Sequence, residues 1–126
     1  MRSVAFATCL AFVATPSLAD GDARAGAAVF RKCSACHTAT EPANRVGPSL
    51  MGVVGRPVAS FGGYNYSDAM KAFGTQGKVW DEVTLSEYLL SPRTLVSGTR
   101  MSFPGLRRPS DIVDLIAYLK NPTAGQ

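Results

Sequence analysis

Two cysteines and a histidine lie within five residues of one another, in the segment CSACH. Cys33, Cys36 and His37 have the spacing Cys-x-x-Cys-His, and His37 is the only histidine among the 126 residues. Three chemistries use a Cys-x-x-Cys pair: a thioredoxin-like redox pair, a zinc site, and covalent attachment of a c-type haem. A plain disulfide is the structural alternative to all three.

The supply of ligands separates these alternatives. A structural zinc ion takes four ligands, whereas Cys33, Cys36 and His37 are the whole supply of cysteine and histidine once the expected N-terminal leader is removed. A thioredoxin-like pair needs strands and leaves His37 without a role, and a disulfide across two residues closes a small, strained loop. In haem attachment each thiol forms a thioether with a vinyl group, and the adjacent imidazole binds the iron. The segment therefore predicts one covalently attached haem c with His37 as an axial ligand.

The second axial ligand has to be another residue type, because the chain has no second histidine. The alternatives are a methionine, a weak ligand or an open position. Met101 lies in SGTRMSFPG, a loop shaped by glycine and proline, whereas Met51 and Met70 are typical packing residues. We expect Met101 to close over the opposite face of the haem. Histidine–methionine ligation raises the reduction potential and fills both axial positions, which favours electron transfer over catalysis.

The N-terminal segment MRSVAFATCLAFVATPSLAD has the pattern of a secretory signal peptide. Arg2 is followed by an apolar run without charge and then by the small residues Ser17 and Ala19. The run is shorter than the roughly 20 residues of a membrane-spanning helix, so a membrane anchor is the less favoured interpretation. We expect cleavage of residues 1–19, which removes Cys9, a single domain over residues 20–126, and export to the periplasm.

Four segments predict helices that position these ligands: Asp22–Lys32, Ser67–Phe73, Val83–Leu90, and the last within PSDIVDLIAYLKNP. Ser110 is the expected cap of the last helix, and Pro92 is expected to end the third. The chain between the helices is rich in glycine and proline and lacks the alternation typical of strands. The sequence thus predicts a small all-α domain with long loops, whose core is completed by a large apolar group.

The chain carries a formal net charge of +4, and its basic residues flank the haem motif and the Met101 loop. A mildly basic exported protein suits acidic protein partners, or transient contact with anionic membrane surfaces. Nucleic acid is excluded as a partner, because the chain has no dense basic run and no recognisable nucleic-acid module. We expect a monomer whose acidic residues Asp81, Glu82, Glu87 and Asp111 lie apart from the docking face. The expected docking residues are Arg31, Lys32, Arg93, Arg100, Arg107 and Arg108.

Nearly all of residues 20–126 resembles the class I c-type cytochromes, in particular the mitochondrial cytochrome c and bacterial cytochrome c2 group. The resemblance runs in order through GDARAGAAVFRKCSACH, VGPSLMGVVGRP, YNYSDAM, WDEVTLSEYLLSPRTLVSGTRMSFPGLRR and DLIAYLK. It implies the class I cytochrome c fold, with helices wrapped around one haem c. It also implies that Gly26 and Phe30 contact Leu115 and Tyr118.

The same resemblance implies roles for residues around the haem. The carbonyl group of Pro48 would accept the N–H of His37 and so fix the ring. Donors in the pocket would satisfy the buried haem propionates, while Tyr88 would lie beside Met101 and Phe103 would shield the haem edge. The implied propionate donors are Arg56, Tyr66, Trp80 and Thr99. Met70 departs from the asparagine common in the family, which predicts a drier pocket.

The expected protein is a soluble periplasmic carrier that cycles haem iron between ferric and ferrous and is not an enzyme. The resemblance implies a cytochrome bc1 complex as donor, and a terminal oxidase or a photosynthetic reaction centre as acceptor. Service as the electron acceptor of a periplasmic dehydrogenase is the alternative within electron transfer. A haem enzyme or gas sensor with a labile sixth ligand, and a haem-free redox or metal-binding module, are the alternatives from other classes.

Overall fold

The computed structural model describes residues 21–124, and the expected signal peptide lies outside them. These residues form helices α1 (Ala23–Phe30), α2 (Asp68–Phe73), α3 (Glu82–Leu90), α4 (Pro92–Leu95) and α5 (Pro109–Lys120). Within this range the only extended pairing is an isolated bridge between Pro57 and Val79. The predicted all-α class is confirmed. No helix in residues 21–124 has the length and apolar character needed to cross a membrane.

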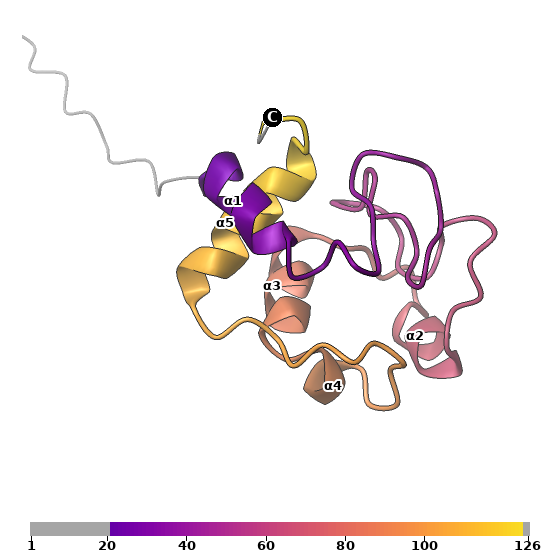
Figure 1. Ribbon diagram of the computed structural model, residues 1–126. Helices are drawn as coiled ribbons and strands as arrows, with labels where there is room; N and C mark the ends of the chain where they lie inside the picture. The colour runs from indigo at the N-terminus through magenta and orange to yellow at the C-terminus, as the bar shows by residue number, and fades with distance from the viewer. Residues whose placement is uncertain (1–20, 125–126) are drawn as a thin grey trace, which may run out of the picture.

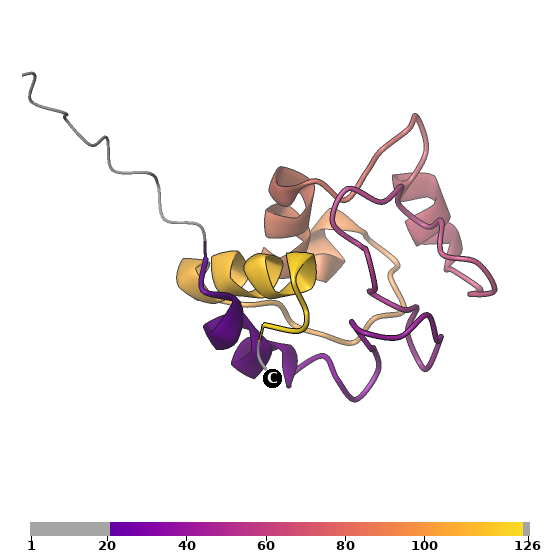
Figure 2. The ribbon, with the colours of Figure 1, turned by 90° about the horizontal axis from the view of Figure 1, so that it is seen from above.

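The first and last helices, α1 and α5, cross in direct contact, and both views place them side by side (Figure 1, Figure 2). Gly26 lies at the crossing, where an added Cβ would overlap with the carbonyl oxygen of Asp114. Next to it the rings of Phe30 and Tyr118 pack with their centroids 5.2 Å apart. The expected contact of Gly26 and Phe30 with the last helix is therefore confirmed, and it depends on a residue without a side chain.

Polar side chains determine where three of the helices begin. The carboxylate of Asp22 accepts the N–H groups of Arg24 and Ala25 at the start of α1. Ser67 caps α2, so it lies just outside the helix that was expected to include it. Asp81 caps α3 in the same way. Each cap satisfies backbone donors that have no partner inside the helix.

Proline determines the start of the other two helices, and here the sequence expectations were incomplete. Pro92 ends α3 as expected, but it also begins the one-turn helix α4, which was not predicted. Helix α5 begins at Pro109, with Arg108 as an N-cap that makes no side-chain cap hydrogen bond, so the prediction of Ser110 as the cap is wrong. A proline suits the first helical position because its missing N–H would have no partner there.

Candidate functional site

A cavity of about 450 Å³ lies against the helices and the long loops. Its volume is typical of a site for a small molecule or cofactor. Its wall contains Cys33, Cys36, His37 and Met101, the four residues predicted to hold a haem. It also contains all seven residues predicted for the haem pocket, namely Pro48, Arg56, Tyr66, Trp80, Tyr88, Thr99 and Phe103.

The two cysteines follow α1 in a series of tight turns. The N–H of Cys33 donates to the carbonyl of Phe30 over 2.8 Å, and the N–H of His37 donates to the carbonyl of Cys33 over 3.0 Å. Both thiols are free and half-buried, and burial raises the pKa of Cys33. The turns therefore bring two thiols and an imidazole to one wall of the cavity.

The ring of His37 is fixed from behind by the loop that follows it. Its Nδ1 lies 2.7 Å from the carbonyl oxygen of Pro48, and because a carbonyl only accepts, Nδ1 carries the hydrogen. An added Cβ at Gly47 would overlap with the ring, so only glycine fits there. Burial lowers the pKa of His37, and the hydrogen bond to Pro48 opposes this in part. The neutral ring thus keeps the lone pair of Nε2 available for a metal.

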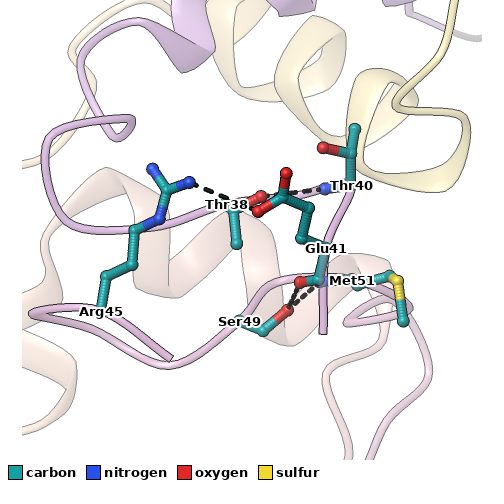
Figure 3. Close-up of polar contacts among 6 residues, drawn as sticks. All are labelled: Thr38, Thr40, Glu41, Arg45, Ser49 and Met51. Carbon is teal, nitrogen blue, oxygen red and sulfur yellow. Dashed lines mark hydrogen bonds and ion pairs between the residues drawn. The ribbon is translucent and has the colours of Figure 1, made fainter. Parts of the chain in front are cut away.

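Side chains of the loop itself hold residues 38–51 in shape (Figure 3). Ser49, which is 0% exposed, donates through Oγ to the carbonyl of Glu41 over 2.5 Å and accepts the N–H of Met51 over 3.2 Å. The N–H of Thr40 donates to Oγ1 of Thr38 over 3.3 Å. Figure 3 also shows the surface pair of Arg45 with Glu41, at 3.5 Å. Sequence reasoning did not identify Ser49, because a serine beside proline and glycine reads as an ordinary loop residue.

Met101 enters the cavity wall from the loop that precedes α5. The hydroxyl group of Tyr88 on α3 lies 3.8 Å from the sulfur of Met101. The backbone N–H of Met101 donates to Oγ1 of Thr99 over 3.3 Å. Burial raises the pKa of Tyr88, so the phenol remains a donor at neutral pH. Beyond Met101, the N–H of Leu106 donates to the carbonyl of Leu89 over 2.8 Å. The methionine therefore lies in a loop that α3 anchors.

Arg56 has an unpaired donor inside the protein. Its Nη1 donates to the carbonyl of Met51 over 3.1 Å and its Nη2 to that of Ser49 over 2.9 Å, whereas the buried Nε has no partner. Buried donors in native proteins normally have partners. Tyr66, also on the cavity wall, accepts the N–H of Phe61 over 3.0 Å, which leaves its own hydroxyl hydrogen free to be donated. Both residues suit an anionic group such as a carboxylate.

These donors fit a c-type haem. Two thiols, an imidazole and a thioether line one cavity, and the unpaired N–H of Arg56 would meet the propionates. The other walls include the aromatic rings of Trp80 and Tyr88, whose centroids lie 4.9 Å apart. Across residues 21–124 no group of three or more His, Cys, Asp or Glu side chains is placed to bind a metal ion.

Comparison with known proteins identifies the family. No family model matches the chain. A cytochrome c of Gossypium barbadense is 47% identical over 106 residues, which cover 82% of this chain and 93% of that protein. The chain belongs to the cytochrome c family. A cytochrome c2 of Agrobacterium tumefaciens is 43% identical over 79% of this chain and 91% of its own length. The solved structure of cytochrome cH from Methylobacterium extorquens superposes with a TM-score of 0.73 at 44% identity, covering 79% and 98% of the two chains.

This membership confirms the predictions about class and cofactor. The cytochrome has the class I fold and binds one covalently attached haem c. It is an electron carrier, in agreement with the expectation drawn from the haem motif and the Met101 loop.

The six basic residues predicted for docking are all exposed. Lys32 and Arg100 line the mouth of the cavity, and the guanidinium group of Arg100 also donates to the carbonyl of Asn65. Arg108 lies 3.6 Å from Asp111. The expectation that Asp111 lies apart from the docking residues is therefore wrong, because α5 begins at Pro109 and places Asp111 one turn after Arg108.

Proposed function

We propose that this cytochrome carries one electron at a time, with Cys33 and Cys36 holding the haem and His37 and Met101 binding its iron. The observation that supports this most directly is the presence of all four side chains on the wall of one cavity. When bound, the haem supplies one-electron chemistry through the ferric and ferrous states of its iron. Filling both axial positions with protein ligands leaves no open site for a substrate, which favours a carrier over an enzyme.

The surrounding residues keep both ligands in place while the charge changes. Pro48 holds the imidazole through Nδ1, and Tyr88 contacts the sulfur of Met101. Neither contact depends on a mobile surface side chain, so little rearrangement accompanies a change of charge. The donors assigned to the haem propionates are Arg56, Tyr66, Trp80 and Thr99, and Phe103 is assigned to the haem edge.

The proposed site of action is the periplasm, reached through the signal peptide at residues 1–19. The proposed donor is a cytochrome bc1 complex, and the acceptor is a terminal oxidase or a photosynthetic reaction centre; a periplasmic dehydrogenase is the alternative donor. Docking would be brief and would weaken as salt screens the charges. The proposed docking residues are Arg31, Lys32, Arg93, Arg100, Arg107 and Arg108.

Absorption spectra of the exported protein test the ligand assignment. Oxidised and reduced spectra are recorded for the wild type, for Met101→Ala, and for Met51→Ala as the matched control with a partly exposed methionine. We expect bands of a thioether-bound haem in all three, and a weak long-wavelength ferric band that only Met101→Ala loses. A wild-type protein that shows haem bands but lacks the weak long-wavelength ferric band, and that binds carbon monoxide rapidly, would favour an enzyme or sensor. Absence of haem would refute the assignment of CSACH.

The partner assignment has its own experiment. The rate of reduction by a purified cytochrome bc1 complex is measured as a function of ionic strength for the wild type, Lys32→Gln and Arg24→Gln. We expect the rate to fall as salt rises, and Lys32→Gln to be slower than Arg24→Gln, which removes an equal charge from α1 outside the docking set. Equal rates for the two variants would contradict docking at the cavity mouth. Cell fractionation and the mass of the secreted protein test export and cleavage after Ala19.

A further inference from the structure

A short segment, residues 62–65, is hydrogen-bonded to the loop behind His37. The side chain of Asn44 donates through Nδ2 to the carbonyl of Gly62 over 3.0 Å. Its Oδ1 accepts the N–H of Ser49 over 3.1 Å, directly after Pro48. The hydroxyl group of Tyr64 donates to the carbonyl of Val46 over 2.9 Å. We call residues 62–65 the strap, because these bonds tie the segment to the loop that fixes the imidazole.

The same strap is bonded to the loop that carries Met101. The guanidinium group of Arg100, adjacent to Met101 in sequence, donates to the carbonyl of Asn65. In the described part of the chain, residues 100–105 have only two side-chain or backbone hydrogen bonds to distant segments, this one and the contact of Tyr88 with Met101. Arg100 is thus a main attachment of the loop on the side away from α3.

The strap is well placed to transmit a displacement from one of its ends to the other. The rings of Tyr64 and Tyr66 pack edge to face with centroids 4.9 Å apart, and both residues line the cavity. The hydroxyl oxygen of Tyr66 accepts the N–H of Phe61, which fixes the turn that leads into the strap. Tyr64, the donor to Val46, and Asn65, the acceptor from Arg100, are consecutive residues. The segment between the two hydrogen bonds is therefore too short to absorb a displacement at one of its ends.

We propose that the strap couples the two loops that hold the iron ligands, and that Tyr64 and Arg100 are positioning residues for Met101. This rests on the proposed ligation by His37 and Met101. The hydroxyl group of Tyr64 bonds to Val46 on the His37 side of the cavity, and it also lies near enough to Tyr88 to raise the pKa of that phenol. The double variant therefore decides whether Tyr64 acts on Met101 through the strap. Arg100 thus has a structural role in addition to the docking role predicted from its charge. Coupling of this kind requires a continuous chain of contacts, which these hydrogen bonds provide.

Binding of imidazole to the ferric holoprotein tests the proposal, because imidazole reaches the iron only when Met101 leaves. The equilibrium constant is measured at a pH where imidazole is neutral, for Tyr64→Phe, Arg100→Gln and the double variant. Arg24→Gln is the control, since it removes an equal charge from an exposed position on α1. Urea unfolding of the same samples, followed by tryptophan fluorescence, separates local opening of the loop from loss of global stability.

We expect imidazole affinity to rise about tenfold in Arg100→Gln and about fivefold in Tyr64→Phe, from the loss of one charged and one neutral hydrogen bond. In the double variant the affinity should stay within about twofold of Arg100→Gln, because a strap released at one end no longer transmits a change at the other. An unchanged affinity in Tyr64→Phe, multiplied effects in the double variant, or an equal rise in Arg24→Gln would overturn the coupling. A wild-type protein without the methionine–iron band would instead overturn the ligation itself.

Discussion

The hydroxyl group of Tyr88 lies 3.8 Å from the sulfur of Met101. Tyr88 belongs to α3, whereas Met101 lies in the loop before α5, so the contact joins two separate parts of the cavity wall. A hydroxyl group that donates a hydrogen bond to sulfur withdraws electron density from it. The sulfur then becomes a weaker electron-pair ligand and would stabilise ferric iron less. Because burial raises the pKa of Tyr88, the hydroxyl keeps its hydrogen at neutral pH. The contact should therefore favour the ferrous state.

Replacing Tyr88 by phenylalanine removes this hydroxyl group and little else. We expect the reduction potential of Tyr88→Phe to fall by about 20–40 mV, the equivalent of one weak hydrogen bond for a one-electron couple. Potentiometric titration of the holoprotein measures the change. Tyr118→Phe is the control, because Tyr118 packs on Phe30. A potential that rises, or that falls equally in both variants, would contradict the role given to the Tyr88 hydroxyl.

Gly26 offers a test of the helix crossing. The Cβ of Gly26→Ala would overlap with the carbonyl of Asp114, so α1 and α5 would have to move apart. We expect the free energy of unfolding to fall by about 1–3 kcal/mol, the usual cost of overpacking, as measured by urea denaturation. Gly62→Ala is the matched control, because nothing lies within 4 Å of its added Cβ. Equal losses in the two variants would mean that the crossing is not the sensitive point.

The cap of α3 predicts a dependence of stability on pH. The N–H of Thr84 donates to the carboxylate of Asp81 over 2.7 Å and lowers the pKa of Asp81 below its ordinary value of 3.8. A lowered pKa in the folded state stabilises the protein at pH values above 3.8, and this contribution disappears as the pH falls through the folded-state pKa. The wild type should thus exceed Asp81→Ala in urea midpoint at pH 7. The two midpoints should converge at strongly acidic pH, and a gap that persists there would argue against the cap.

The haem should be needed for the fold as well as for function. The cavity of about 450 Å³ lies against buried residues of the core, such as Leu85 and Trp80. Without haem these side chains lose their partners, and a small domain has few others to offer. We expect the variant carrying both Cys33→Ala and Cys36→Ala to lose most of its helical circular dichroism and its cooperative urea transition. A haem-free variant with a sharp transition at the wild-type midpoint would refute this.

Local patterns in the sequence were sufficient to predict α1, α2, α3 and α5, because caps and apolar spacing act within a few residues. The one-turn helix α4 was missed since four residues are too few to show a period. The pairing of Arg108 with Asp111 was missed for a related reason. It depends on α5 beginning at Pro109, and the prediction placed the cap at Ser110.

The haem site was predictable to the extent that its chemistry resides in side chains. The spacing of Cys33, Cys36 and His37, and the loop around Met101, are visible in the sequence and line one cavity in the structure. The strap was not predictable, because its acceptors are the backbone carbonyls of Val46 and Asn65. Every residue has a carbonyl group, so the sequence carries no sign of which one is used.

The crossing of α1 and α5 has a consequence for the order of events during synthesis. The N–H of Asp22 donates to the carboxylate of Asp114 over 2.8 Å, across 92 positions of the chain. A ribosome releases the N-terminal end first, so α1 emerges long before its partner exists. The chain therefore cannot close until α5 has been made, and the nascent protein remains open. The proposed signal peptide would also lead the chain across the membrane with its N-terminal end first, so the CSACH segment, directly after α1, would reach the periplasm before α5 and be open there to whatever machinery attaches its haem.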